Sequence, residues 1–291
     1  MTRTIGDYLL IILSIIGSFA SIFAYAEYIG PKLNDQGIFG VAIVGIFAFI
    51  FFGYSLYLVS KYRNKVRYAE VFEDINIGFA AMHSLDRKDE MTLDDLAVAL
   101  IGVCDGLSNA FSKINGHKIG VCIKHLEFDN GHALVKTLVR DQNSKANNRK
   151  TGDADTTKHW LTGNSDFNFI YSKFDDDNVD TTSYVEKRLP IKIDYLNSRL
   201  KNWPPKKLII GNNLNRRKQW PLPYRSTIVV PIVPLLADDQ NQQALRGFLC
   251  IDSPNESSFY EKVDVNILKG VADGIYRKID IINELTSEPN E

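Results

Sequence analysis

The chain has 291 residues, a net charge of −1 and three cysteines. The balanced charge excludes a strongly basic nucleic-acid-binding protein, and three cysteines without a CxxC spacing provide neither a disulfide framework nor a zinc site. We therefore expect no DNA partner, no metal and no cofactor. The apolar residues are unevenly distributed, because almost no charged residue lies between positions 8 and 60.

Two long apolar runs precede the charged part of the chain. They cover Tyr8–Ile29 and Ile38–Ser60, and each has roughly the 20 residues that a helix needs to cross the hydrocarbon of a bilayer. The link between them, GPKLNDQG, is short and polar. The sequence therefore predicts an antiparallel transmembrane hairpin over residues 1–60, and membrane lipid is an expected partner.

Basic residues set the expected orientation of this hairpin. Four of them follow the second run: Lys61, Arg63, Lys65 and Arg67. The link between the runs carries only Lys32. Because basic residues are enriched on the cytoplasmic side of a membrane, we expect a multi-pass protein of the cell inner membrane whose C-terminal domain is cytoplasmic.

The N-terminal segment leaves two pairs of alternatives open. The small residues of Ala24-Tyr25-Ala26 resemble a signal-peptide cleavage site, so the first run is either a retained helix or a removed leader. Small residues such as Gly17, Gly45 and Gly53 let helix backbones approach closely. They suit either packing within the hairpin or a homo-oligomer.

After the second run the pattern becomes amphipathic. Apolar residues recur at every third or fourth position: Val66, Ala69, Phe72, Ile75, Phe79 and Met82. This spacing predicts a helix that continues the second run and connects it, over residues 61–91, to a domain at residues 92–291. Thr92 with the acids after it predicts the start of the next helix, and Asn115-Gly116 predicts its end.

Two pairs of strands are predicted within the domain. The first pair flanks Asp129-Asn130-Gly131, a strong hairpin turn. The second pair covers Ser226–Leu235 and Leu245–Asp252, on either side of a polar loop. Ser258–Glu261, with the sequence SFYE, has the pattern of a capping box and predicts the start of a long last helix.

A less regular insertion separates the two strand pairs. Gln142–Lys158 is polar and predicts a long loop. Short helices are expected near Ser165–Phe174 and Val185–Leu200. The order helix, hairpin, insertion, hairpin, helix predicts an α+β fold in which an antiparallel sheet is flanked by helices.

The closing elements resemble those of a GAF domain. The resemblance rests on RSTIVVPIV, RGFLCIDSP and the long last helix, and it covers Thr92–Leu285. PAS-like sensor domains show a similar alternation. The resemblance implies a ligand pocket between the sheet and the insertion. The family's cyclic-nucleotide signature is not matched, because SKFDDDN at Ser172–Asn178 has its residue types at the wrong spacing.

The three cysteines fall within apolar patterns. Cys104 lies in a predicted helix, and Cys122 and Cys250 lie in predicted strands. Each is interpreted as a small core residue and not as an attachment point for a bilin pigment.

The best candidate for a binding segment is the basic stretch Lys201–Arg225, which contains no acid. Arginine holds phosphate in a bidentate fork, and aromatic rings stack on bases. The stretch therefore predicts an anionic or nucleotide-like ligand, or an anionic lipid headgroup, and a solvated loop is the alternative. The candidate ligand-binding residues are Trp203, Lys206, Lys207, Arg216, Arg217, Lys218, Trp220, Tyr224 and Arg225.

These features predict a membrane-anchored cytosolic sensor of a small molecule, which passes its ligand state to its membrane helices or to a partner. A membrane-acting defence effector is a special case, by analogy of layout alone. The alternative is a ligand-free membrane scaffold that recruits a protein partner or anionic lipid. We expect no enzyme, because the sequence has no P-loop, nucleophile elbow or dinucleotide fingerprint. It also has no kinase, cyclase or DNA-binding segment, so output is expected through the membrane helices, oligomerisation or a partner.

Overall fold

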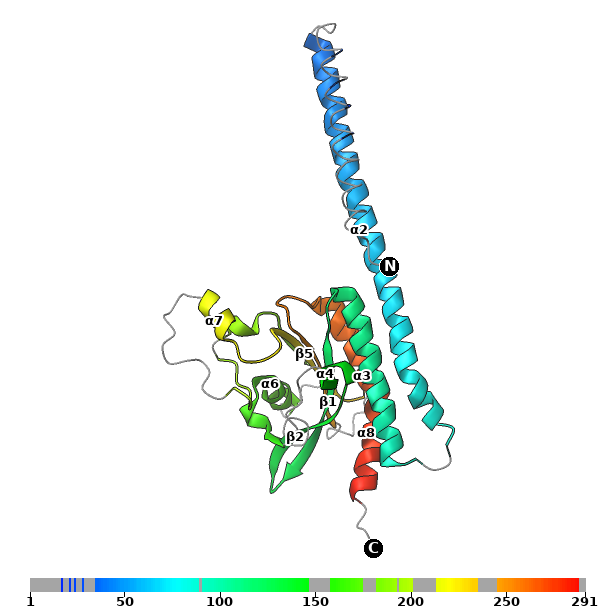
Figure 1. Cartoon of the computed structure of the whole chain (residues 1–291), viewed down its shortest axis with the longest axis vertical. Coiled ribbons are helices and arrows are strands. Elements are labelled where there is room, and N and C mark those ends of the chain that lie inside the picture. The colour runs from blue at the N-terminus through cyan, green and yellow to red at the C-terminus, as the bar shows by residue number, and fades with distance from the viewer. Residues whose placement is uncertain are drawn as a thin grey trace. The chain divides into compact units, whose positions relative to one another are not determined.

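The structure is a computed structural model that divides into two compact units, Met1–Val66 and Arg67–Glu291. It describes residues 35–88, 91–146, 158–174, 182–192, 194–200, 213–234 and 245–287, together with Gly17, Ser21, Ala24 and Tyr28. The second unit is an α+β domain built on a six-stranded antiparallel sheet in the order β3-β2-β1-β6-β5-β4 (Figure 1).

The elements of the chain follow the predicted order. The long helices are α2 (Asp35–Leu85), α3 (Leu93–Asn115) and α8 (Glu261–Ser287). The strands are β1 (Gly120–Asp129), β2 (His132–Arg140), β3 (His159–Trp160), β4 (Tyr184–Glu186), β5 (Ser226–Ile232) and β6 (Gly247–Ser253). The short helices are α4 (Gln142–Ala146), η2 (Leu161–Gly163), α6 (Ser165–Phe174), η3 (Leu189–Ile191) and α7 (Asn213–Gln219).

Helix α2 covers the second apolar run and ends at Leu85. Many of its described large apolar side chains are exposed by 45–72%: Ile46, Phe49, Ile50, Phe51, Tyr54, Leu56, Tyr57, Leu58 and Val59. The predicted first membrane helix lies largely outside the described residues. Among the helices described, α3 meets a length and hydropathy test for membrane spans, but half of its apolar window is buried within the protein. A shorter apolar stretch lies at Ala48–Val59.

Local signals set the ends of α3 and of the first hairpin. The Asp95 N–H donates to the Thr92 hydroxyl at 3.2 Å, and the Asp95 carboxylate accepts from the Thr92 N–H, which completes a capping box. Gly116 ends the helix in the left-handed region at φ 73°. Asn130 and Gly131 both have positive φ, as a two-residue turn between β1 and β2 requires.

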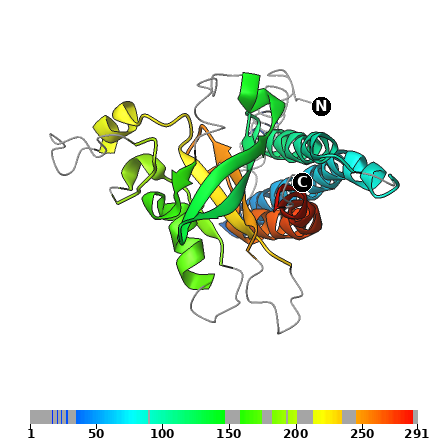
Figure 2. The ribbon, with the colours of Figure 1, turned by 90° about the horizontal axis from the view of Figure 1, so that it is seen from below.

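Alternation along the central strands divides the buried residues between two cores. One core, here called the helix-side core, lies against α3 and α8 and includes Val121, Ile123, Ile228, Val230, Leu249 and Ile251. The insertion-side core lies on the opposite face of the sheet, against α6, and includes Cys122, Leu126, Phe167, Val229, Phe248 and Cys250. Figure 2 shows α3 and α8 on one side of the strands and the short helices of the insertion on the other. Because successive side chains of a strand point to opposite faces of the sheet, odd and even positions of the same strand belong to different cores.

The end of α2 belongs to the helix-side core. Its buried residues there are Val71, Ile75, Met82 and Leu85. The backbones of α2 and α3 touch at two glycines: a Cβ atom on Gly106 would lie 2.9 Å from the Gly78 Cα and 2.7 Å from the Asp74 carbonyl oxygen. Lys113 on α3 forms an ion pair with the Asp74 carboxylate at 2.7 Å. The segment Arg67–Leu85 is thus an integral helix of the second unit.

Two details of the predicted helices need comment. Within the apolar pattern of residues 61–91, Ile75 and Met82 are buried and Phe79 packs against the helix-side core, whereas Phe72 is 58% exposed. The predicted capping box at Ser258–Glu261 is wrong. The Ser258 hydroxyl bonds Ser253 instead, and the Asp264 carboxylate accepts the N–H of Tyr260 at 2.6 Å before α8 begins.

Two predictions within the insertion also need correction. The helix expected at Val185–Leu200 is absent from the described part of this range. Tyr184–Glu186 instead pairs with β5 as an edge strand, and Pro190 favours the short 3₁₀ turn that follows. The polar segment Gln142–Lys158 begins with helix α4, and residues 147–157 lie outside the described part. The helix predicted at Ser165–Phe174 is confirmed as α6.

Replacing Gly106 by Ala should lower the free energy of unfolding by about 1–3 kcal/mol, because the new methyl group forces α2 and α3 apart. Gly270→Ala is the matched control, since Gly270 is an exposed helical glycine with open space at its Cβ position. Alanine there should stabilise α8 by up to about 1 kcal/mol. Urea unfolding of the detergent-solubilised chain, followed by tryptophan fluorescence, measures both. Equal stabilities for the two variants would contradict the close packing of α2 against α3.

Candidate functional site

The second unit contains a cavity between the sheet and the insertion, where the sequence resemblance placed a ligand pocket. Its volume is about 50 Å³, which is room for a few water molecules or a small polyatomic group. Its floor consists of strand residues on the insertion side of the sheet, and its walls come from β3, α6 and the segment 197–199. The polar and titratable side chains of its lining include Cys122, Lys124, Arg140, His159, Asp166, Arg199, Thr227, Cys250 and Asp252.

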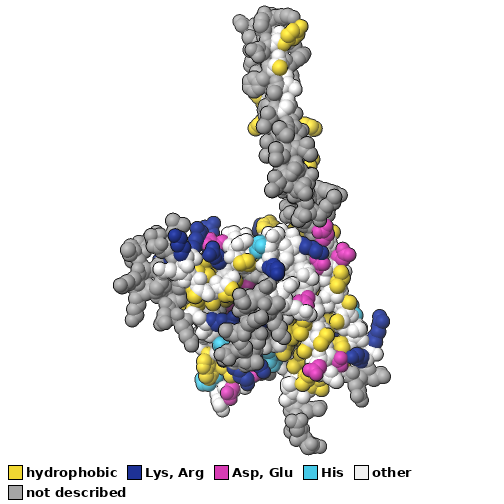
Figure 3. All heavy atoms as spheres, in the orientation of Figure 1, with side chains coloured by type: hydrophobic (Ala, Val, Ile, Leu, Met, Phe, Trp, Pro, Cys, Tyr) yellow, Lys and Arg dark blue, Asp and Glu magenta, His cyan; other side chains and the backbone are white. Residues whose placement is uncertain are grey.

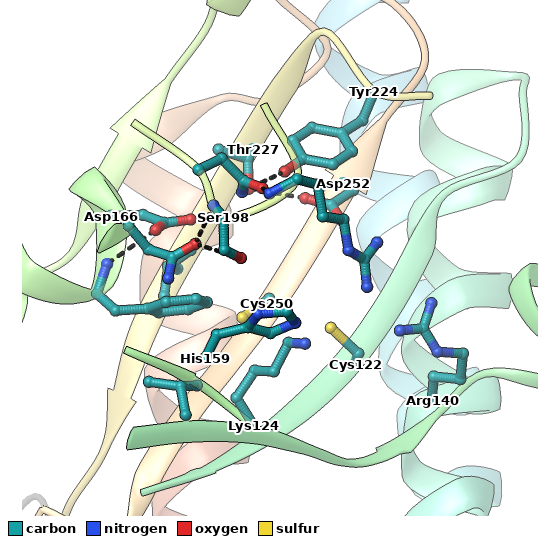
Figure 4. Close-up of a pocket in the computed structure, with 16 residues that line it drawn as sticks. Cys122, Lys124, Arg140, His159, Asp166, Ser198, Tyr224, Thr227, Cys250 and Asp252 are labelled. Atoms are coloured by element: carbon teal, nitrogen blue, oxygen red, sulfur yellow. Dashed lines mark hydrogen bonds between the residues drawn. The ribbon is translucent and has the colours of Figure 1, made fainter. Parts of the chain in front are cut away.

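One end of the cavity collects basic side chains from four segments. Lys124 comes from β1, Arg140 from the end of β2, His159 from β3, and Arg199 from the segment before α7. Figure 4 shows the Lys124 side chain beside the imidazole ring of His159 and near the Cys122 sulfur atom. Burial lowers the pKa of the Lys124 ammonium, and the charges of Arg199 and Arg140 add to this lowering. Burial, together with the charges of Lys124 and Arg199, also lowers the pKa of His159.

The partners of Lys124 do not include a carboxylate. Its ammonium donates to the Thr137 hydroxyl, and among the residues that the structure describes no acidic group lies within ion-pair distance of it. The buried Nε2 atom of His159 has no hydrogen-bond partner within the described structure. A buried polar atom without a partner costs free energy. This end of the cavity is therefore suited to an anionic group that would accept from both side chains.

The other end of the cavity is acidic and polar. The Asp252 carboxylate accepts from the Thr227 hydroxyl at 2.8 Å (Figure 4). Asp166 at the start of α6 accepts from the Tyr195 hydroxyl at 3.2 Å and from the Phe167 N–H at 2.9 Å. Burial raises the pKa of the Asp166 carboxyl to about 6 despite these two bonds. This end can accept hydrogen bonds from amine or hydroxyl groups of a ligand.

Two cysteines lie side by side on the cavity floor. Cys122 on β1 is directly opposite Cys250 on β6, and both are free and buried. A hydrogen bond from the Cys250 thiol, with the nearby charges of Lys124 and Arg140, lowers the pKa of Cys122. Burial, together with that donated bond, raises the pKa of Cys250. The sequence interpretation of both as core residues agrees with their burial but does not include their position in the cavity.

The basic stretch chosen from the sequence is only partly brought to this cavity. Tyr224 lines it. Trp220 is buried in the insertion-side core and donates from its indole N–H to the Tyr224 carbonyl oxygen at 2.5 Å, so it is not an exposed stacking surface. Three further candidates, Trp203, Lys206 and Lys207, lie outside the described residues.

The remaining basic candidates lie on or near α7, where Figure 3 shows Lys and Arg side chains with acidic side chains beside them. Arg217 forms an ion pair with Glu256 at 2.7 Å, and Arg216 donates to the Ile191 carbonyl oxygen at 3.3 Å. Arg225 donates to the Arg217 carbonyl oxygen at 3.5 Å, and Lys218 is exposed. These contacts are those expected of the alternative given by the sequence, a surface loop whose positive charge is balanced by nearby acidic residues. Binding by this segment stays a prediction.

Sequence reasoning missed the basic end of the cavity because its members come from distant positions. One signal was present: Lys124 lies between Cys122 and Leu126, at positions of the same parity in an apolar strand. A lysine on an inward-facing strand position is rarely fully buried without a partner. No comparable local signal exists for His159 or Arg199.

Comparison with known proteins gives structural likeness alone. No protein-family model and no curated protein matches the chain. A type II free methionine-R-sulfoxide reductase from Thermoplasma acidophilum is similar in structure, at 16% identity over 64% of this chain and 94% of that chain, with a TM-score of 0.39. The blue-light absorbing form of a GAF domain from Thermosynechococcus elongatus is similar at 12% identity, over 68% and 94%, with a TM-score of 0.37. A GAF domain from an Acinetobacter phosphoenolpyruvate-protein phosphotransferase matches at 8% identity, over 73% and 98%, with a TM-score of 0.38. The likeness gives no information on the ligand or activity of this chain.

Asp166 should make the stability of the second unit depend on pH. Its carboxyl has a pKa of about 6 in the fold and about 3.9 in an unfolded chain. The unfolded state therefore loses the proton first, and stability falls as pH rises from about 4 to about 7. Asp166→Asn removes this dependence; its single side-chain oxygen can still accept from the Phe167 N–H, and its amide group can donate to the Tyr195 hydroxyl oxygen. Urea unfolding at pH 4.5 and 7.5 should show the variant gaining on the wild type by about 2 kcal/mol over that range. A stability difference that is the same at both pH values would contradict the assignment.

Proposed function

We propose that the chain is a membrane-anchored sensor whose α+β domain binds a small metabolite in the cavity between the sheet and the insertion. The observation that carries the proposal is the basic end of that cavity, where Lys124, His159, Arg140 and Arg199 come together from four segments. The ligand class that fits is a small molecule with a carboxylate or phosphate group at one end. Hydroxyl or amine groups at its other end would donate to Asp252 and Asp166.

The proposed affinity comes from relieving electrostatic repulsion. Lys124 and His159 have lowered pKa values because burial and neighbouring positive charges disfavour their protonated forms. An anion bound between them favours the protonated forms and replaces the missing carboxylate partner of Lys124. Such charge-assisted hydrogen bonds are about twice as strong as bonds between neutral groups.

Ligand state can reach the helices because the same strands line both cores. Cys122 and Cys250 face the cavity, while Val121 and Ile251 beside them pack in the helix-side core. That core includes Val71, Ile75 and Met82 of α2. Because protein interiors are closely packed, a shift of β1 or β6 has to be accommodated by the helices. The segment Arg67–Leu85 is the proposed output element.

Membrane anchoring is supported by the first part of α2. A helix that is apolar all round is either buried in a protein or spans a membrane, and most of the described large apolar side chains from Ile46 to Val59 are exposed. The basic residues that follow, Lys61 to Arg67, favour a cytoplasmic location for the second unit. Passage of the ligand state to the membrane helices or to a partner protein is part of this proposal.

The ligand proposal predicts a thermal shift that depends on Lys124. Purified full-length protein in detergent is melted with inorganic phosphate, acetate or glycine in large excess. A ligand at 100 times its Kd stabilises by about 2.7 kcal/mol, which should raise Tm by several degrees. Lys124→Met should abolish the shift.

Lys218→Met is the matched control, because Lys218 is an exposed lysine on α7. It should keep the thermal shift seen with the wild type. Loss of the shift in Lys218→Met but not in Lys124→Met would move the site to the basic stretch. No shift with any anion would favour the ligand-free scaffold.

The anchoring proposal predicts the behaviour of the chain in membranes. The protein should stay in the membrane pellet after alkaline carbonate extraction, and its second unit should be digested by protease in inside-out vesicles but protected in spheroplasts. Recovery in the carbonate supernatant, or digestion in intact spheroplasts, would overturn the proposed anchoring or its orientation.

A further inference from the structure

The cavity floor holds a pair of thiols whose placement has a chemical consequence separate from ligand binding. Cys122 and Cys250 are register partners on adjacent antiparallel strands, and their exposed fractions are 3% and 4%. Both residues line the cavity, so a solute small enough to enter it would lie beside them. Figure 4 shows the two sulfur atoms on the cavity side of the sheet, with the Lys124 side chain near them.

The strand geometry is compatible with a bond between the two sulfur atoms. The Leu126 N–H donates to the Arg246 carbonyl oxygen at 3.1 Å, and pair types alternate along an antiparallel ladder. Leu126 and Arg246 are therefore a hydrogen-bonded pair, and so is every second pair along the ladder from them. Cys122 and Cys250 lie four residues away on each strand, so they are also a hydrogen-bonded pair. Its Cα atoms are then about 5.5 Å apart, within the range of about 4.4–6.8 Å found in disulfides.

The surroundings distinguish the two sulfur atoms. Lys124 and Arg140 place positive charge near Cys122, and the Cys250 thiol donates to the Cys122 sulfur, so the pKa of Cys122 is lowered. A thiolate is the reactive form of cysteine toward peroxides. Cys104 offers a contrast, since it is buried in α3 within the helix-side core and burial raises the pKa of its thiol.

We propose that Cys122 and Cys250 form a peroxide-reactive dithiol site that closes to a disulfide across β1 and β6. In the first step the Cys122 thiolate attacks one oxygen of hydrogen peroxide, the O–O bond breaks, and the hydroxide that leaves takes up a proton to become water. Cys122 is then a sulfenic acid. In the second step the Cys250 sulfur attacks the Cys122 sulfur, the S–O bond breaks, and a second water leaves with the Cys250 proton. The two thiols lose two electrons and two protons, and one hydrogen peroxide becomes two waters.

This site does not rest on the ligand proposal, because the reaction needs only peroxide and the two thiols. It adds a second input to the domain. The disulfide replaces a thiolate beside Lys124 with a neutral group and ties together the two strands that line both cores. Oxidation therefore changes the charge of the cavity and the freedom of β1 and β6 at the same place.

The test is disulfide mapping of the full-length chain in detergent. The protein is reduced, desalted and treated with hydrogen peroxide, and free thiols are counted after denaturation. The count should fall from three to one. Proteolysis without reduction should give one linked peptide pair containing Cys122 and Cys250, lighter than the two reduced peptides by two hydrogen atoms. Three free thiols under conditions that oxidise glutathione, or a link involving Cys104, would overturn the proposal.

Single variants test the order of the two steps. Cys104→Ala should form the same link as the wild type. In Cys250→Ala the reaction should stop at a sulfenic acid on Cys122, which dimedone labels and mass spectrometry locates. Dimedone labelling of Cys250 in Cys122→Ala, without labelling of Cys122 in Cys250→Ala, would contradict the assigned roles. Tryptophan fluorescence of each variant confirms that it is folded before the label is added.

Discussion

The second unit depends on strands β1, β5 and β6, in which successive side chains point to opposite faces of the sheet. Every residue of β5 and β6 is buried, so neither face of these strands is available to solvent. Odd and even positions must therefore satisfy two different environments. Apolar positions such as Val121, Ile228 and Ile251 pack against helices, whereas their neighbours Cys122, Thr227 and Asp252 face the insertion. One strand thus supplies both structural and chemical residues, and a slip of one residue would exchange them.

Features with local causes could be predicted from the sequence. The cap at Thr92, the left-handed end at Gly116 and the Asn130-Gly131 turn each depend on a few neighbouring residues, and each is present in the structure. The capping box at Ser258 failed although its pattern was local. The hydroxyl had better partners in Ser253 and His117, which the fold brings close.

The site itself could not be assembled from the sequence for a different reason. Its basic end combines Lys124, Arg140, His159 and Arg199, and no fixed spacing links them. The basic stretch was prominent because its charge is dense along the chain. A dense run of charge along the chain need not give a dense charge in space, because the fold can bring acidic residues beside it. Arg217, for example, is paired with Glu256, a residue 39 positions away. The one local signal for the cavity was Lys124, which lies at a position of β1 whose neighbours two residues away are buried. That signal can be interpreted only when the strands that pair with β1 are known.

The cavity and the output helix lie on opposite faces of one sheet, so the strands are the shared element between them. The helix-side core includes the end of α2, whose backbone touches α3 at Gly78 and Gly106. Close backbone packing resists small independent movements of the two helices. A ligand or a disulfide that repositions β1 relative to β6 therefore acts on a packed unit. In this account an anion at Lys124 and an oxidant at Cys122 are two inputs to the same pair of strands.

The most direct measurement of the central claim is an unbiased mass-spectrometric comparison of the small molecules that leave full-length wild-type protein and Lys124→Met on denaturation, after identical purification. The account predicts that an anionic metabolite is released by the wild type in an amount approaching one per chain, and that it is strongly depleted from the variant. Release of the same molecules in equal amounts from both proteins would show that the basic end of the cavity does not hold the ligand.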